Sequence, residues 1–334
     1  MKEFIALFIA RNKEFFRDRG SLIWAFVMPP IIIGVVAIAF SNGNQPMFKL
    51  GIFNEGEGAT RLPAALEAEY IQRVDYQDFS KALQKVQHHQ LDMLVIPTTP
   101  LRYWINEESQ TGIVLEALLK SESSIALQKE TVSGRPVRYV DWVIPGILGM
   151  NILFSGLFGI GYVIVRYRKN GVLKRFQATP VTPFKFLAAQ LASRLMIMLI
   201  VSIMVYVVAD FFIDFLMLGS YWLLILVAVL GDIAILSIAL VIAARFSSEE
   251  LANGLLNLLS FPMLLLSEVW FSLDGAPQWL SSFSKALPLT HLVGAARKIM
   301  IEGAGFTDIS QHLIYLAVIS IVCLIVSARL FRWN

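Results

Sequence analysis

The sequence predicts an α-helical polytopic membrane protein, with six transmembrane helices and a small α/β extracytoplasmic domain between helices 1 and 2. Three observations lead to this fold class. Of the 334 residues, 56% are hydrophobic and 16% are charged, whereas soluble domains average about 25% charged residues. The hydrophobic residues form uncharged blocks close to the roughly 20 residues that a helix needs to cross a bilayer. One segment, residues 41–141, has instead the composition of a water-soluble fold.

Uncharged blocks locate the predicted spans. Residues 22–40 and 142–165 contain no charged residue in 19 and 24 positions, and both predict transmembrane helices. The other blocks, which contain few or no charges, are residues 186–216, 221–244, 251–267 and 312–328. We therefore assign residues 1–20 to a cytoplasmic amphipathic interfacial helix, 21–40 to transmembrane helix 1, 41–141 to the external domain and 142–334 to transmembrane helices 2–6.

The distribution of lysine and arginine orients these spans. Five such residues precede the first span, and six lie in the loop of residues 166–185, which has no acidic residue. By contrast, the link between spans three and four has none, and the link between spans five and six has three. Because cytoplasmic loops carry the excess of lysine and arginine, we expect both chain termini in the cytoplasm. The net charge of +3 is too small to suggest a nucleic-acid partner.

The external segment alternates between strand and helix patterns. Strands are predicted at residues 49–54, 71–76, 91–97 and 102–106, and helices at residues 60–69, 79–90 and 112–129. A small α/β domain results. The chain has a single cysteine, Cys323, and His88 and His89 are adjacent rather than spaced along one helix face, so no metal site is expected.

Two cytoplasmic segments combine apolar with basic side chains. Residues 2–19 are too short and too charged to span, and they suit a helix in the headgroup plane. The simple role of this helix is anchoring, and the alternative is a surface that also touches a cytoplasmic partner. The loop of residues 166–185 is a second such element, for which attraction to lipids alone is the simpler reading. Within it, Thr182 is the expected N-cap of the next helix, with Pro183 in its first turn.

The centre of this loop carries the most specific sequence pattern in the chain. Residues 171–183 read GVLKRFQATPVTP, which resembles the G-x-L-x-R-x-x-x-T/S-P-x segment of the permease subunits of type-2 ABC exporters. The resemblance covers the whole chain, from an amphipathic leader and one span to a large external domain and five more spans. In that family the segment contacts the nucleotide-binding subunit, and the resemblance implies this role for residues 172–180. The residues assigned to ATPase coupling are Val172, Leu173, Lys174, Arg175, Phe176, Thr179 and Pro180.

The loop departs from the family pattern in its charge. Many members place a glutamate near its start and another before the arginine. This chain has Tyr167, Arg168 and Lys169 at the first place and Lys174 at the second. The loop lies at the same place in the chain as in the family, but it lacks the two glutamates that many members carry there.

A second resemblance lies in the external link between spans five and six. Residues 278–280 (QWL) and 287–291 (LPLTH) look like the family's P-x-W-L to N/L-P-L-T-x segment, which dips into the membrane from outside as a helical hairpin. Independently, the link is too apolar for a plain loop and is interrupted by prolines and glycines. We therefore expect a re-entrant external segment at residues 271–310. Non-helical backbone at that depth needs cover from protein or water, which points to the translocation pathway.

Three common sequence patterns of catalytic sites are absent from the chain. It contains no G-x-x-x-x-G-K-[ST], H-E-x-x-H or G-x-S-x-G. We therefore expect that the chain is not an enzyme and holds no cofactor, and that ATP and Mg²⁺ bind to a partner ATPase.

Ionisable residues within spans are costly and therefore carry a functional expectation. Asp232, about eleven residues into its span, is the main candidate for the pathway, with a packing role as the alternative. Glu268 and His291 are candidates at the outer vestibule, with a plain interfacial position as the alternative. Arg194 is expected to extend its guanidinium towards the cytoplasm.

These expectations combine into one leading hypothesis and two alternatives. The leading hypothesis is a permease subunit in the bacterial cytoplasmic (inner) membrane, paired with a second permease subunit as a homodimer and with two copies of a cytoplasmic ATPase. Its substrate is expected to be apolar or amphipathic, such as a drug or a lipid, because the spans show little charged lining. The alternatives are a membrane sensor or scaffold that uses the external domain, and a proton-coupled secondary carrier. A carrier would need several buried acidic groups near the midplane, and only Asp232 qualifies.

Overall fold

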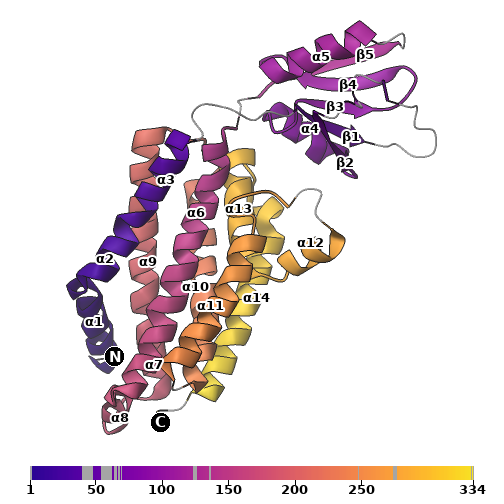
Figure 1. The fold of residues 1–334 in the computed structure, drawn as a ribbon. Helices are drawn as coiled ribbons and strands as arrows, with labels where there is room; N and C mark the ends of the chain where they lie inside the picture. The colour runs from indigo at the N-terminus through magenta and orange to yellow at the C-terminus, as the bar shows by residue number, and fades with distance from the viewer. Residues whose placement is uncertain are drawn as a thin grey trace. The chain divides into compact units, whose positions relative to one another are not determined.

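The chain divides into two compact units, one helical and the other built on a β-sheet (Figure 1). A computed structural model describes residues 2–39, 48–53, 62–63, 66, 68, 70–122, 126–134, 137–246, 248–273, 277–331 and 333. The helical unit consists of residues 1–39 and 140–334, and the sheet unit of residues 40–139.

Long apolar helices make up the helical unit. Four stretches of the described residues are long and apolar enough to cross a membrane. One runs through α6 (Tyr139–Gly156), the π-helical segment η2 (Leu157–Tyr162) and α7 (Val163–Lys169), and the others are α9 (Pro183–Ile213), α10 (Tyr221–Arg245) and α14 (Phe306–Leu330). These four lie where spans two, three, four and six are predicted.

The helices at the two remaining predicted spans are not among those that are long and apolar enough to cross a membrane. Span one is divided into α2 (Arg19–Phe26) and α3 (Met28–Ala39), because Pro29 and Pro30 have no N–H with which to continue the helical hydrogen bonds. Span five corresponds to α11 (Glu249–Leu266), which has 18 residues and begins with two glutamates. The observed helices therefore support four spans by length and composition.

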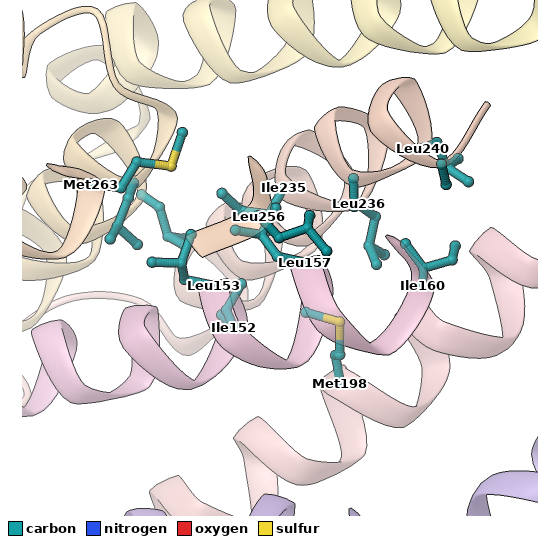
Figure 2. Close-up of a cluster of buried hydrophobic side chains, with 14 of the residues drawn as sticks. Ile152, Leu153, Leu157, Ile160, Met198, Ile235, Leu236, Leu240, Leu256 and Met263 are labelled. Atoms are coloured by element: carbon teal, nitrogen blue, oxygen red, sulfur yellow. The ribbon is translucent and has the colours of Figure 1, made fainter. Parts of the chain in front are cut away.

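α10 lies at the centre of the helical unit, in contact with α9, α11, α14, η2 and α13 (Pro288–Glu302). The side chains between these helices are aliphatic: Leu153, Leu157, Ile160 and Ile235 are buried in one cluster, which Figure 2 shows. Gly156 lets α6 and α10 approach closely, because a Cβ there would lie 2.8 Å from Cγ2 of Ile235. Only about a quarter of the apolar windows of α9 and α14 is buried, at 28% and 22%, so both helices present apolar surface outward.

The two ends of the helical unit differ in what they carry. α1 (Lys2–Arg17), α8 (Val172–Gln177) and the C-terminal end of α14 lie at one end of the bundle, while α12 (Gln278–Ser284) and α13 lie towards the other (Figure 1). α1 packs against α9.

The sheet unit contains five described strands. Their order is β2 (Ile71–Tyr76), β1 (Phe48–Phe53), β3 (Met93–Ile96), β4 (Leu101–Asn106) and β5 (Leu127–Val132), and only the β3–β4 pair is antiparallel among the described strands. α4 (Phe79–Gln87) and α5 (Gln110–Glu122) cover opposite faces, since Tyr103 and Ile105 of β4 cluster with α5 and Trp104 clusters with α4. Because both faces are covered, β4 is buried along most of its length.

The helix predicted at residues 112–129 is wrong in its last third. α5 ends at Glu122, and the chain then forms β5, which pairs in parallel with all six residues of β4. The Glu130 carboxylate of β5 accepts hydrogen bonds from Trp104 at 2.9 Å and Arg102 at 3.3 Å. Pairing with a neighbouring strand therefore overrides the local helical spacing. The helix predicted at residues 60–69 falls mostly outside the described ranges.

Candidate coupling surface and membrane core

The loop after α7 forms the short helix α8 between two well-defined ends. Gly171 separates α7 from α8 with φ +71°, a left-handed conformation that glycine adopts without strain. At the other end, the Thr182 side chain accepts a hydrogen bond from the backbone N–H of Lys185 at 3.3 Å, and Pro183 occupies the first turn of α9. The predicted N-cap is therefore confirmed.

α8 has a buried side and an exposed side. Leu173 is fully buried in the core of the helical unit, and Val172 and Phe176 are half-buried. The remaining residues assigned to coupling are exposed: Lys174, Arg175, Thr179 and Pro180. The expectation that Leu173 faces a partner is therefore wrong, because this side chain anchors α8 to the hydrophobic core of the helical unit. The surface that α8 offers to another molecule is basic and polar.

Charged groups attach α1 to the segment that leads into α8. Arg11, 7% exposed, donates to Glu14 at 2.8 Å and to the carbonyl of Gly159 at 2.8 Å. The Glu14 carboxylate also accepts hydrogen bonds from Arg166 at 3.4 Å and from Tyr167. The leader helix is thus connected to α7 and η2 as well as being amphipathic.

Arg168 connects α7 to the C-terminal end of α10. Its guanidinium, 7% exposed, donates to carbonyl groups that lack helical partners at a helix end. These carbonyls are those of Ala243 (2.9 Å), Ala244 (3.2 Å) and Phe246. Its neighbour Lys169 forms a 3.0 Å ion pair with Glu249 at the start of α11. The residues before α8 therefore hold the ends of two further helices, a role that no spacing in the sequence indicates.

η2 brings arginine side chains into the membrane core. In a π-helix each N–H pairs with the carbonyl five residues back, so a change from the α pattern leaves a carbonyl free for another donor. Arg194 of α9 donates to the Ser155 carbonyl at 3.0 and 2.6 Å, and Arg11 to that of Gly159. The Arg194 guanidinium also lies against Gly159, where a Cβ would be 2.1 Å from Cζ. The predicted extension of Arg194 towards the cytoplasm is therefore wrong, because the side chain is engaged inside the protein.

Asp232 lies on α10 and is fully buried. No described residue donates a hydrogen bond to either oxygen of its carboxyl group. Beside it, Gly231 lets α13 approach α10, since a Cβ there would lie 2.5 Å from Cδ1 of Leu292. A buried carboxyl group without donors is costly, which keeps Asp232 a candidate for the pathway alongside the packing alternative.

Arg297 and Glu268 fix the hairpin of α12 and α13 to its neighbours. Arg297, 9% exposed, donates to the carboxylate of Glu268 at 3.3 Å and to its carbonyl at 2.7 Å. The same guanidinium stacks 3.8 Å from the ring centroid of Trp142 in α6. Glu268 also accepts from the backbone N–H of Leu273 at 3.1 Å. Its carboxylate is thus engaged within the protein.

His291 of α13 contacts α14 through two aromatic side chains. Its Nδ1 lies 3.1 Å from Nδ1 of His312, and its Nε2 donates to the carbonyl of Lys285 at 2.8 Å. The ring of Tyr315 stacks on the imidazole, with the two ring centroids 3.9 Å apart. The sequence does not reveal these partners, because His312 is 21 positions away on another helix. No group of three or more potential metal ligands occurs among the described residues.

Comparisons with known proteins agree on the family to which this chain is similar. The family described as ABC-2 family transporter protein matches residues 19–329. The chain is 27% identical over 220 residues to ABC transporter G family member 20 of Dictyostelium discoideum, covering 64% of this chain and 30% of that protein. It is 28% identical over 161 residues to the inner membrane transport permease YhhJ of Escherichia coli, covering 47% of this chain and 42% of that protein.

A third relative is matched over a larger share of its own length. The daunorubicin resistance ABC transporter permease protein DrrB1 of Streptomyces coeruleorubidus is 24% identical over 198 residues, which cover 58% of this chain and 69% of that protein. The alignment thus spans less than half of the first two relatives and about two thirds of this one.

Proposed function

The chain belongs to the ABC-2 transporter family, and on that premise we propose that it is the membrane-spanning permease subunit of an ABC exporter. A separate cytoplasmic ATPase, in two copies, supplies the nucleotide site with its ATP and Mg²⁺, and a second copy of the permease completes the pathway as a homodimer. The proposed location is the bacterial inner membrane. In this proposal α2–α3 and α11 act as the first and fifth of six spans, and both termini are cytoplasmic.

The proposed substrate is apolar or amphipathic, such as a drug or a lipid. Most side chains buried around α10 are aliphatic, with Asp232 and Arg194 as charged exceptions, which favours molecules that partition from the bilayer over ions. One relative bears the name of a daunorubicin resistance permease, which supports the same class. In this proposal Asp232 lies in the pathway, and Glu268 and His291 border its outer vestibule.

The two-sided character of α8 is the observation that carries the proposal. Its exposed side holds Lys174 and Arg175, while Leu173 on the opposite side is buried in the hydrophobic core of the helical unit. A force on the exposed side is therefore transmitted to the helices beneath it. Arg168 of α7 transmits that movement to α10 through its contacts with the carbonyl groups. Arg166 of α7 transmits it to α1 through its hydrogen bond to Glu14. Both the ATPase and the pathway then bias one two-state element, as coupling requires.

Purification of the tagged chain with its partners tests this proposal. We expect a stoichiometric polypeptide with a Walker A sequence to copurify in mild detergent and to be identified by mass spectrometry. The double variant Lys174→Glu with Arg175→Glu should lose this partner while keeping its size-exclusion profile. A matched control reverses two exposed basic residues of the sheet unit, Arg73→Glu with Lys81→Glu, and should keep it.

Two results would argue against the proposal. One is wild-type recovery of the ATPase with the α8 double variant, and the other is the absence of any Walker A partner after crosslinking. Leu173→Asp is not a suitable probe of the contact, because a charge at this buried position disrupts the anchoring of α8 itself.

A further inference from the structure

Two of the four histidines of the chain face each other where α13 packs against α14. His291 belongs to α13 and His312 to α14, and their Nδ1 atoms are 3.1 Å apart. Both side chains are partly exposed. The pair therefore joins two helices through side chains that are in part open to solvent.

The contacts of His291 fix its tautomer and its ring plane. Its Nε2 atom lies 2.8 Å from the carbonyl of Lys285. A carbonyl group only accepts hydrogen bonds, so Nε2 carries the proton and Nδ1 keeps its lone pair. Tyr315 stacks on the ring and is itself held by a 2.7 Å hydrogen bond to the carbonyl of Ala286. The lone pair on Nδ1 is thus directed towards His312.

The contact between the two Nδ1 atoms can be made by a proton or by a metal ion. In the hydrogen-bonded form His312 donates, because Nδ1 of His291 has no proton. Two imidazole nitrogens that bind one Zn²⁺ at about 2.0–2.1 Å in tetrahedral geometry lie roughly 3.3–3.4 Å apart. The observed separation of 3.1 Å is slightly shorter. An ion can therefore take the place of the proton when the His312 ring turns, without a large movement of either helix.

We propose that His291 and His312 form an exchangeable binding site for a divalent transition-metal ion of the zinc type. Imidazole suits Zn²⁺, Cu²⁺ and Ni²⁺, and a ligating histidine almost always donates its other ring N–H to an acceptor such as a backbone carbonyl, as His291 does. The remaining positions around the ion are left to water, so binding is reversible. The proton on Nδ1 of His312 moves through solvent to its Nε2, and a neutral pair releases no proton.

A bound ion ties α13 to α14 more firmly than the hydrogen bond does. α13 is also attached to Glu268 through Arg297, so the ion restrains the whole external hairpin. Binding itself does not depend on the function proposed above. An effect of the ion on export does rest on that function, and measuring binding on the purified chain separates the two.

Electron paramagnetic resonance of Cu²⁺ tests the site on the full chain in detergent, purified with a tag that contains no histidine. Cu²⁺ is the probe because nitrogen ligands bind it more tightly than Zn²⁺. We expect hyperfine splitting from two nitrogens. His291→Gln and His312→Gln should each lose this splitting and weaken binding at least about tenfold, since outer-shell partners alone are worth about 10–100-fold. The matched control, His88→Gln with His89→Gln, changes the other two histidines and should keep both properties.

Hydrogen exchange with Zn²⁺ gives a second readout. Zn²⁺ should slow exchange of the backbone amides of α13 in the wild type, EDTA should reverse this, and His312→Gln should show no effect of Zn²⁺. If His291→Gln fails to fold because it loses the Lys285 contact, His312→Gln decides alone. Splitting from two nitrogens that persists in the single variants overturns the proposal. Wild-type binding no tighter than that of His312→Gln means that the pair is a hydrogen bond only, and it overturns the proposal as well.

Discussion

Several glycines of the helical unit leave no space for a side chain. Among the described glycines, Gly159 would give the shortest contact if a Cβ were added. A Cβ at this position would lie 2.1 Å from Cζ of Arg194, so Gly159→Ala forces the guanidinium away from the Ser155 carbonyl. We expect a loss of roughly 1–3 kcal/mol in unfolding free energy, typical of overpacking. The measurement is the thermal unfolding midpoint in detergent. Gly254→Ala is the matched control, because nothing lies within 4 Å of its added Cβ. Equal midpoints for the two variants would show that Arg194 is not held against η2.

In the sheet unit, Glu116 makes stability depend on pH. Burial would raise the pKa of this carboxyl, but hydrogen bonds from Lys120, Lys129 and Tyr103 outweigh it and the pKa is lowered overall. The distances from Glu116 to the last two are 3.1 and 3.0 Å. A lowered folded-state pKa contributes stability above the unfolded value of about 4.3, and this stability is lost as the pH falls through the folded value.

Glu116→Gln isolates this contribution. Hydrogen exchange of peptides from β4, α5 and β5, measured on the full chain, should be faster in Glu116→Gln than in the wild type at pH 7. The difference should shrink as the pH falls below about 4, because the wild-type carboxyl is then protonated too. A difference that stays constant between about pH 7 and about pH 3 would mean that the side chain acts through packing rather than through its charge.

Residue roles could be predicted only where the sequence places both partners close together. Thr182 and Lys185 are three positions apart, and the N-cap is found as expected. Arg168 and the carbonyls it binds are about 75 positions apart, and nothing in the local pattern connects them. Leu173 illustrates the converse error, because an apolar residue in a basic loop can equally face a partner or the protein core.

At the scale of elements, the C-terminal end of α10 depends on a buried arginine rather than on the nearby surface ion pair. Arg168→Met removes the donors to the free carbonyls but keeps most of the chain length. We expect a loss of about 1.5–3 kcal/mol, the range for hydrogen bonds to charged groups, and faster hydrogen exchange at residues 240–246. Lys169→Met breaks an ion pair whose lysine is 60% exposed, and should cost less than about 1 kcal/mol. The reverse order of effects would contradict the role given to Arg168.

Element boundaries could be predicted where hydrophobicity alone determines them. The apolar blocks that correspond to α6, α9, α10 and α14 can be located from the sequence, because burial in a bilayer requires long apolar helices. α14 begins at Phe306, six positions before the predicted start, because four of its first six residues are polar and these residues lie outside the apolar block. β5 could not be found in the same way, since its pairing with β4 is a contact between distant segments.

At the scale of the whole molecule, the contacts around α8 form one connected path. In the proposed function the exposed side of α8 receives an ATPase, and Leu173, Arg168 and Glu14 link that contact to the membrane core, to α10 and to α1. The start of α1, α8 and the end of α14 lie at one end of the helical unit, as Figure 1 shows. The cytoplasmic position of this end, predicted from lysine and arginine, belongs to the proposed function. The sequence predicted which segments contribute, but not the contacts that join them.

Site-specific photo-crosslinking in the native membrane is the sharpest test of α8 as the ATPase contact. A photoreactive amino acid is placed at one of two exposed positions at the C-terminal end of α8, Gln177, its last residue, or Thr179, just after it. As a control, it is placed at exposed Tyr70 of the sheet unit. We expect both α8 positions to capture one polypeptide carrying a Walker A sequence, and position 70 to capture none. Failure of both α8 positions to capture such a polypeptide, in cells where the wild-type chain supports export, would contradict the proposed coupling role.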